Sequence, residues 1–270
     1  VLRELKDRKG EALVLDFLGD AYSYLRQYEK AINSYQQSLP IFQELKDREQ
    51  EANVLKNWGN VYKSLGQYEK AVDLFQQSLP IYRELKDGKG EANILKDLAF
   101  LFRELEDRER EAEVLNNLGN VYKSLGQYER AIDFYQQSLP IYQELKDRKG
   151  EANVLNNLGT AYDNLGQHKR AINFFQQSLP IYQELKDRKG EANVLNDLGD
   201  AYKNLGQYER AIDFHERSLR ICQELKNRKG EADVLKNLGN VYYLLEQYQR
   251  AINFYEQSLP IYQELKDRKG

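Results

Sequence analysis

The chain repeats itself every 40 residues, and this period constrains the fold more than any other feature. The block Glu151–Gly190 recurs with few changes from Glu11, Glu51, Glu111, Glu191 and Glu231. A period of about 20 to 50 residues indicates a repeat architecture, in which each unit buries its apolar face against its neighbours. Such an array presents a long surface and no central pocket. The sequence therefore favours binding another molecule over chemical transformation.

Composition narrows the possible functions. The 270 residues are 31% charged and carry a net charge of −3, so the basic excess that phosphate neutralisation needs is missing and we expect no nucleic-acid partner. No apolar run reaches the roughly 18 residues of a membrane span, so we expect no membrane segment. One cysteine, Cys222, and two histidines are too few for a zinc site, so we expect neither metal nor cofactor. A lone cysteine also fits a reducing compartment, and we predict a cytoplasmic location.

The ends of the sequence match parts of the repeat. The segment 1–10 copies the last ten residues of a unit, and the chain stops at a unit boundary. We therefore read the chain as a piece of a longer protein. The expected domains are N-terminal units at 1–90, a truncated half unit at 91–110 and four C-terminal units at 111–270.

One unit reads as two helices. Between Glu111 and Gly150, apolar residues recur at spacings of three and four, which predicts two amphipathic helices. We expect Gly126 to end the first helix. We expect the glycine of the KDRKG connector to end the second helix in the same way. Gly119 lies inside the first helix, which indicates a close approach by a neighbouring helix near Ala131. The predicted fold is an all-α solenoid of stacked antiparallel hairpins.

These positions carry a family signature. In one unit it consists of Leu115, Leu118, Gly119, Tyr122, Ala131 and Tyr135, and equivalents recur along the chain. The pattern resembles the tetratricopeptide repeat family. Units of 40 residues, longer than the usual 34 or so, resemble those of kinesin light chains and Pins/LGN-type adaptors, and near-identical copies resemble tandem arrays of filamentous cyanobacteria. The resemblance implies a right-handed superhelix that acts as a scaffold and captures peptides.

A proline interrupts the second helix of most units. The prolines are Pro40, Pro80, Pro140, Pro180 and Pro260, and one unit has Arg220 instead. Because proline removes a hydrogen bond and clashes with the preceding turn, we expect a kink or a break after Leu39 and its equivalents. The expected role is control of curvature.

The unit that starts at Glu91 has only 20 residues, and the solenoid is expected to be interrupted there. Two outcomes remain open from the sequence. Residues 91–125 could form one long helix, or the chain could turn near Asp107–Arg110. Either outcome could expose apolar surface, so homo-oligomer formation or helix exchange through 91–125 is a second hypothesis.

A polar face of the first helix is the candidate binding surface. A helical wheel places it opposite the packed stripe, and in the resembling family that face lines the concave groove. The candidate peptide-binding residues are Lys56, Asn57, Asn60, Asn117, Asn120, Lys123, Asn157, Asn196, Lys203, Lys236, Asn237 and Asn240. Asparagine is a poor residue inside a helix, but its amide can bond peptide backbone without selecting side chains. The lysines could attract acidic groups.

Two readings of this face stay open. Recent duplication copies every residue, and bonds between neighbouring asparagines could be purely structural. Tyr24 and Tyr243 lie on the same face near the two ends and could anchor a ligand or contact further repeats. We predict a scaffold that binds a partner peptide, with a structural spacer or self-assembly module as the alternative. We expect no enzyme, because the sequence contains no catalytic constellation.

Overall fold

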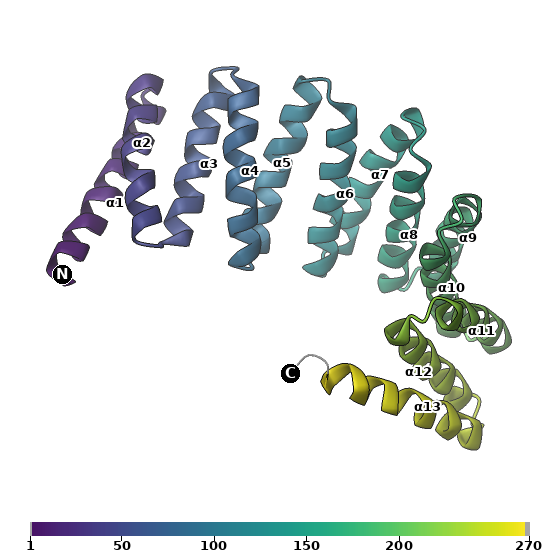
Figure 1. The fold of residues 1–270 in the computed structure, drawn as a ribbon. Helices are drawn as coiled ribbons and strands as arrows, with labels where there is room; N and C mark the ends of the chain where they lie inside the picture. Colours follow the sequence, from purple (N-terminus) through teal and green to yellow (C-terminus); the bar gives the residue numbers. More distant parts are fainter. Residues whose placement is uncertain (1, 268–270) are drawn as a thin grey trace. The chain divides into compact units, whose positions relative to one another are not determined.

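The computed structural model describes residues 2–267, with side chains placed for 7–266, and these residues form thirteen α-helices. They group into two compact units, Val1–Gly126 and Gln127–Gly270. The first unit contains α1 Leu2–Tyr24, α2 Tyr28–Glu44, α3 Arg48–Ser64, α4 Tyr68–Glu84, α5 Gly88–Glu104 and α6 Arg108–Ser124. The second contains α7 Tyr128–Glu144, α8 Arg148–Asn164, α9 His168–Glu184, α10 Arg188–Asn204, α11 Tyr208–Glu224, α12 Arg228–Leu244 and α13 Tyr248–Asp267. Within each unit every helix packs on the helix that follows it in sequence (Figure 1), which confirms the predicted solenoid of helix hairpins.

The helices and turns follow a half-repeat rhythm. Each helix from α2 to α12 has 17 residues, and the short turns between these helices are all equal in length. Four turns from a first to a second helix place Gly66, Gly126, Gly166 or Gly206 in the left-handed region, as expected for a helix end, and two others place Arg26 and Glu246 there. Turns from a second helix to the next first helix use a lysine there instead, such as Lys146 with φ of 56°.

The predicted role of the connector glycine is wrong. Gly150 lies inside α8, which starts at Arg148 after the cap residue Asp147. The Asp147 carboxylate accepts a hydrogen bond from the Gly150 amide at 2.9 Å, as an N-terminal cap does. Gly150 is needed for space, because a Cβ there would lie 2.3 Å from the ring of Tyr142.

A second glycine contact holds each hairpin together. A Cβ on Gly19 would lie 2.5 Å from the Tyr35 ring, and a Cβ on Gly159 would lie 2.4 Å from the Phe175 ring. The sequence correctly indicated a close approach at this helix position. The nearest atoms belong to an aromatic ring of the second helix, however, and not to a helix backbone. The rings of Tyr35 and Phe175 are almost fully buried, so the glycine lets them pack directly against the first helix.

The predicted break at proline is also wrong. Helices α2, α4, α7, α9 and α13 continue through their prolines. In α2, Pro40 lies on the exposed side, so water can satisfy the carbonyl that proline leaves without a donor. Two residues earlier, the buried Ser38 hydroxyl donates to the Tyr35 carbonyl at 3.2 Å and satisfies an acceptor inside the same turn.

The truncated unit turns, so the single long helix is excluded. Helix α5 ends at Glu104, and α6 begins at Arg108 after a turn in which Glu106 has a φ of 58°. The turn resembles the others, because the deletion removed one helix and one turn and left the remaining lengths unchanged. Arg103 of α5 pairs with Glu111 of α6 at 2.7 Å and closes the hairpin.

We expect Gly150→Ala to lower stability by about 1–3 kcal/mol, because the added methyl group must displace the Tyr142 ring. Gly10 provides a matched control. It occupies the same position of the repeat in α1, and a Cβ added there would meet no atom within 4 Å. Gly10→Ala should therefore be neutral or stabilising by up to about 1 kcal/mol. Urea unfolding followed by circular dichroism measures both changes, and equal losses would contradict the packing argument.

His215 replaces the aromatic ring that packs on the hairpin glycine, and it makes stability dependent on pH. The side chain is fully buried against Gly199, and neither ring nitrogen has a hydrogen-bond partner. Burial lowers the pKa of His215 to about 4; the charged groups facing it are Asp200, 4.0 Å away, which opposes this shift, and Lys203, which adds to it. The folded state therefore binds fewer protons than the unfolded state between about pH 4 and 6.5, and stability falls as the pH is lowered through that window.

We predict that His215→Phe removes a pH-dependent loss on the order of 3 kcal/mol between pH 6.5 and 4. Phe175 occupies the equivalent position and shows that the repeat accepts phenylalanine there. The reverse change, Phe175→His, should add a loss in the same window. Unfolding midpoints measured at several pH values test both variants, and parallel pH profiles for wild type and His215→Phe would refute the assignment.

Candidate amide face on the first helices

The first helices of successive repeats stand next to one another within each unit. Direct contacts join α1 with α3 in the first unit, and α8 with α10 and α10 with α12 in the second. Most of the polar residues singled out in the sequence lie along these rows. We call this surface the amide face. It comprises the asparagine, aspartate and lysine side chains at the polar positions of these first helices.

In the first unit, hydrogen bonds and an ion pair tie neighbouring first helices together through this face. The Asn57 amide of α3 donates to the Asp20 carboxylate of α1 at 3.0 Å. Lys63 of α3 pairs with Asp97 of α5 at 2.5 Å. The face is therefore cross-linked along the row.

The second unit shows the same arrangement with other residues. The Asn237 amide of α12 donates to Asn196 Oδ1 and to Asp200 Oδ2 of α10, each at 3.1 Å. Asn204 of α10 donates to Asp163 of α8 at 3.1 Å. Asn237 is buried, so part of the asparagine ladder has a structural role.

Tyrosines of the second helices donate hydrogen bonds to side chains of the first helices. The Tyr35 hydroxyl donates to Asp20 at 2.6 Å, and the Tyr255 hydroxyl donates to Asn240 at 2.9 Å. A second set lies one helix turn or more away, where Tyr182 donates to Asn153 at 2.7 Å and Tyr262 to Asp233 at 2.5 Å. Each tyrosine belongs to the same hairpin as its acceptor, so the core of the hairpin orients the side chains of the face.

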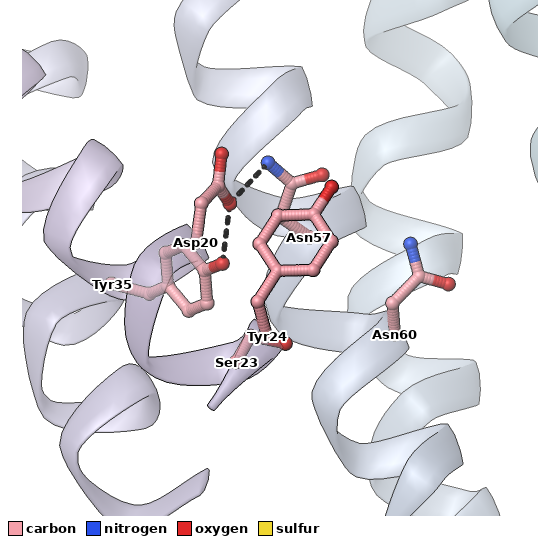
Figure 2. A pocket seen from close by; sticks show the side chains of 6 residues that line it. All are labelled: Asp20, Ser23, Tyr24, Tyr35, Asn57 and Asn60. Carbon is pink, nitrogen blue, oxygen red and sulfur yellow. Dashed lines mark hydrogen bonds between the residues drawn. The ribbon is translucent and has the colours of Figure 1, made fainter. Parts of the chain in front are cut away.

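One hollow of about 230 Å³ opens on the face in the first unit (Figure 2). Its lining residues are Asp20, Ser23, Tyr24, Tyr35, Asn57 and Asn60. Asp20 accepts from both Tyr35 and Asn57 through the same oxygen, so its carboxylate is held in one orientation (Figure 2). Tyr24 is almost fully exposed, and its ring lies over the hollow.

Asp16 lies one turn before Asp20 on α1 and is 5% exposed. Burial and the nearby Asp20 together raise the pKa of Asp16 to about 6, against the opposing effect of Lys56. One oxygen of Asp16 is buried without a hydrogen-bond partner. The first unit therefore carries more negative charge on this face than the asparagine pattern alone indicates.

The remaining predicted residues lie on the expected helices. Asn117, Asn120 and Lys123 lie on α6, Asn157 on α8, and Lys236 on α12. Their side chains are half-buried except that of Lys236, which is exposed. Helix α6 packs directly on α5, so Asn117, Asn120 and Lys123 lie outside the row of α1, α3 and α5 in the first unit. In the second unit the row consists of α8, α10 and α12.

The lysines of the face are largely engaged within the chain. Lys203 pairs with Asp200 at 2.5 Å on the same helix, and Lys56 donates to Asn53 at 3.2 Å. Lys63 pairs with Asp97, as described above. These contacts weaken the expectation that the lysines attract acidic groups of a ligand.

The helical wheel places Asp200 on the face, but sequence reasoning missed Asp20, Asp97 and Asp163 as members of the network. A signal was available, because Asp20 and Asp200 stand at the repeat position of Asn60 and Asn240. The tyrosines of the second helices carry a further signal. Their hydroxyls need partners when buried, and this requirement points to the polar residues opposite them.

Other residues with reactive or metal-binding side chains form no metal site among the described residues. No group of three or more histidine, cysteine, aspartate or glutamate side chains in the described residues is placed to hold a metal. His168 contacts Asp163 at 2.6 Å, and Cys222 is a buried free thiol whose pKa is raised by burial. No described helix is both long and apolar enough to cross a bilayer.

Comparison with known structures gives proteins built from the same kind of repeat. The chain aligns with BtubC (BKLC) from P. vanneervenii at 23% identity, covering 88% of this chain and 92% of that one, with a TM-score of 0.50. A putative kinesin light chain of Podosopora anserina with nearly identical TPR-like repeats aligns at 19% identity over 81% and 96% of the two chains, with a TM-score of 0.52. At these identities the likeness concerns the fold alone.

A third structure shows the repeat as part of a larger protein. The STAND protein PH0952 from Pyrococcus horikoshii has a tetratricopeptide repeat sensor, and it aligns at 17% identity with a TM-score of 0.55. The alignment covers 98% of this chain but only 45% of that one. A search of curated proteins finds no match.

The comparison with protein families is decisive. Models described as tetratricopeptide repeat match residues 14–49, 50–113, 110–184 and 190–264, which together span most of the sequence. The matched segments contain the glycine and aromatic positions that hold the hairpins described above. The chain belongs to the tetratricopeptide repeat family.

Proposed function

We propose that the amide face binds an extended segment of a partner protein. Membership of the tetratricopeptide repeat family supports a role as a protein–protein interaction scaffold. The observation that favours the amide face is the chain of bonds that orients its side chains, such as Asn57 to Asp20 and Asp20 to Tyr35. Side chains that are already held in place lose little conformational entropy when a ligand binds to them.

The bonded amides keep unused hydrogen-bonding capacity. A side-chain amide has two donors and an acceptor oxygen with two lone pairs. Asn57 spends one donor on Asp20 and remains half-buried, so its other groups can reach a ligand. The donors and acceptors of a peptide backbone alternate, and amides at repeated positions can match both without selecting side chains.

The charges of the face favour backbone recognition over attraction of an acidic ligand. Lys63 and Lys203 are neutralised by aspartates, whereas Asp16 and Asp20 add negative charge in the first unit. An acidic segment would gain little there. A neutral or basic segment fits this part of the face better.

The alternative, self-association through the interrupted region, has less support. Helices α5 and α6 bury Leu98, Phe102 and Leu118 within their unit. Phe100 is the one large apolar side chain of α5 that stays exposed among the described residues, and its ring already meets Tyr68 edge-on at 6.2 Å. One exposed ring is a small surface for a stable interface.

We predict that the double variant Asn57→Ala/Asn60→Ala lowers affinity for a bound peptide about thirtyfold, since each of the two lost hydrogen bonds contributes about 1 kcal/mol. An array of immobilised peptides of varied sequence, probed with wild type, identifies binders for titration. The matched control is Asn33→Ala/Asn173→Ala, which removes two exposed asparagines from the second helices α2 and α9.

Thermal unfolding of both double variants checks that loss of binding does not reflect loss of fold. Equal affinities of the two double variants for every peptide that wild type binds would count against the amide face. Binding that fails only in the control would place the site on the second helices.

A further inference from the structure

The Asp20 carboxylate lines the hollow of the first unit and has no cationic partner among the described residues. Its Oδ1 accepts hydrogen bonds from the Tyr35 hydroxyl at 2.6 Å and from the Asn57 amide at 3.0 Å. Neither donor is charged, so no ion pair offsets the charge of the carboxylate. Its second oxygen accepts no hydrogen bond within the described part of the chain. The hollow of about 230 Å³ is therefore lined by a carboxylate with unused capacity (Figure 2).

The equivalent aspartate of the second unit does have a cationic partner. Asp200 of α10 stands at the repeat position of Asp20. It also accepts from an asparagine of the next first helix, since the Asn237 amide donates to its Oδ2 at 3.1 Å. The ammonium group of Lys203 pairs with its other oxygen at 2.5 Å. The chain itself thus shows that an ammonium group fits beside a carboxylate at this position.

Ser23 stands in α1 where Lys203 stands in α10. A serine side chain is short and uncharged, so this exchange leaves Asp20 without an ion pair and leaves space where a lysine side chain would lie. Ser23 itself lines the hollow, which places the space next to the missing lysine. The other lining residues belong to α1, α2 and α3, and none of them precedes Asp20, so contacts inside the first unit form the hollow.

We propose that the hollow takes the ammonium group of a lysine side chain of the bound segment, in the place that Lys203 fills beside Asp200. This inference rests on the proposed function, because the lysine belongs to the segment that the amide face binds. It adds the chemistry of the partner: the segment carries a lysine at the point where it crosses α1 and α3.

The acceptors of the hollow match the donors of an ammonium group. A lysine ammonium has three donors and no acceptor. The free oxygen of Asp20, the Ser23 hydroxyl and the Asn60 amide oxygen all line the hollow. The side chains of Ser23 and Asn60 have no other hydrogen-bond partner among the residues that the structure describes. One ammonium group can therefore use acceptors that the chain leaves without donors.

The hydrogen bonds of Asp20 favour lysine over arginine. A guanidinium group binds a carboxylate best through two parallel hydrogen bonds, one to each oxygen. Oδ1 of Asp20 already accepts from Tyr35 and Asn57, so little capacity remains there for a second arm of the guanidinium group. A compact ammonium group needs only the other oxygen.

The ring of Tyr24 lies over the hollow and offers a surface for the lysine side chain (Figure 2). The methylene groups of lysine pack on apolar surface while the ammonium group keeps its polar contacts. Other tyrosines of the first unit already hold lysines in this way. The Lys30 ammonium lies 5.3 Å from the centre of the Tyr22 ring, and the Lys70 ammonium lies 5.2 Å from that of Tyr62.

A second carboxyl group adds to the attraction for a cation. Asp16 lies one turn before Asp20 on α1, and its Oδ1 is buried without a hydrogen-bond partner. With a pKa of about 6, Asp16 is mostly ionised at neutral pH, and Lys56 offsets part of this charge. An incoming ammonium group therefore meets the charge of two carboxyl groups against one lysine.

Asp20→Asn tests the charge, because it removes the charge and keeps the shape of the side chain. The repeat accepts asparagine at this position, as Asn60 and Asn240 show. The matched control is Asp73→Asn, which removes an exposed aspartate from the second helix α4 of the same unit. For peptides that wild type binds on the array, isothermal titration calorimetry should show affinity lowered roughly tenfold or more by Asp20→Asn. Asp73→Asn should change it by less than about twofold.

Replacing each lysine of a bound peptide by glutamine identifies the contact. One such replacement should weaken binding to wild type by the same factor as Asp20→Asn, and should have little further effect on Asp20→Asn itself. Arginine at that peptide position should restore only part of the affinity. Ser23→Lys is a second variant, which recreates the pair of Lys203 with Asp200 and should weaken binding by filling the hollow. Thermal unfolding checks that all variants are folded.

The possible results separate this inference from the proposed function. Peptides that bind equally well with glutamine at every lysine overturn the lysine site and leave binding by the amide face intact. Equal losses for Asp20→Asn and Asp73→Asn also overturn it, because they indicate a general effect of charge. Full affinity with arginine overturns the preference for lysine. If wild type binds no peptide at all, the proposed function fails and this inference fails with it.

Discussion

The packing of aromatic rings onto glycines is the contact on which this fold depends. One such contact joins the two helices of a hairpin, as Phe175 does against Gly159, and another joins successive hairpins, as Tyr142 does against Gly150. In both cases a side chain no larger than a hydrogen atom lets a ring approach the helix. The first contact recurs at Gly19 and Gly59 and the second at Gly90 and Gly190, so these repeats share the same packing. The amide face inherits this regularity, since its side chains are spaced by the helices that carry them.

Much of the fold could be predicted from the sequence, because the signals involved are local and repeated. The spacing of apolar residues determines which positions become buried, and Val154, Leu155 and Leu158 are buried as their spacing indicates. The errors arose where one residue type can serve two purposes. Gly150 was read as a helix end but provides space for a ring, while Lys146 adopts the left-handed conformation. Pro40 predicts a kink or a break, yet its exposed position lets the helix continue without a break.

The candidate site was less predictable, for a physical reason. A helical wheel places side chains on a face but does not show what they contact across to the next helix. The bond from Asn57 to Asp20 joins residues 37 positions apart and depends on the packing of α1 against α3. The same limit hid the pairing of lysines with aspartates, which changes the ligand that the face would suit. The structural reading of the asparagine pattern holds for Asn237, which is buried and cross-links the row.

The equal length of first and second helices has an evolutionary consequence. Helices begin at Tyr28, Arg48, Tyr68, Gly88 and Arg108, so one helix and its turn always occupy the same length of chain. Recombination between near-identical gene segments can then add or remove half a repeat without truncating any helix, and residues 91–110 record such an event. A gene of this kind can gain or lose helices one at a time. Each gain or loss of a single helix shifts the polar residues that follow it from odd-numbered to even-numbered helices, or the reverse. Slippage during replication thus becomes a source of new surfaces on an unchanged scaffold.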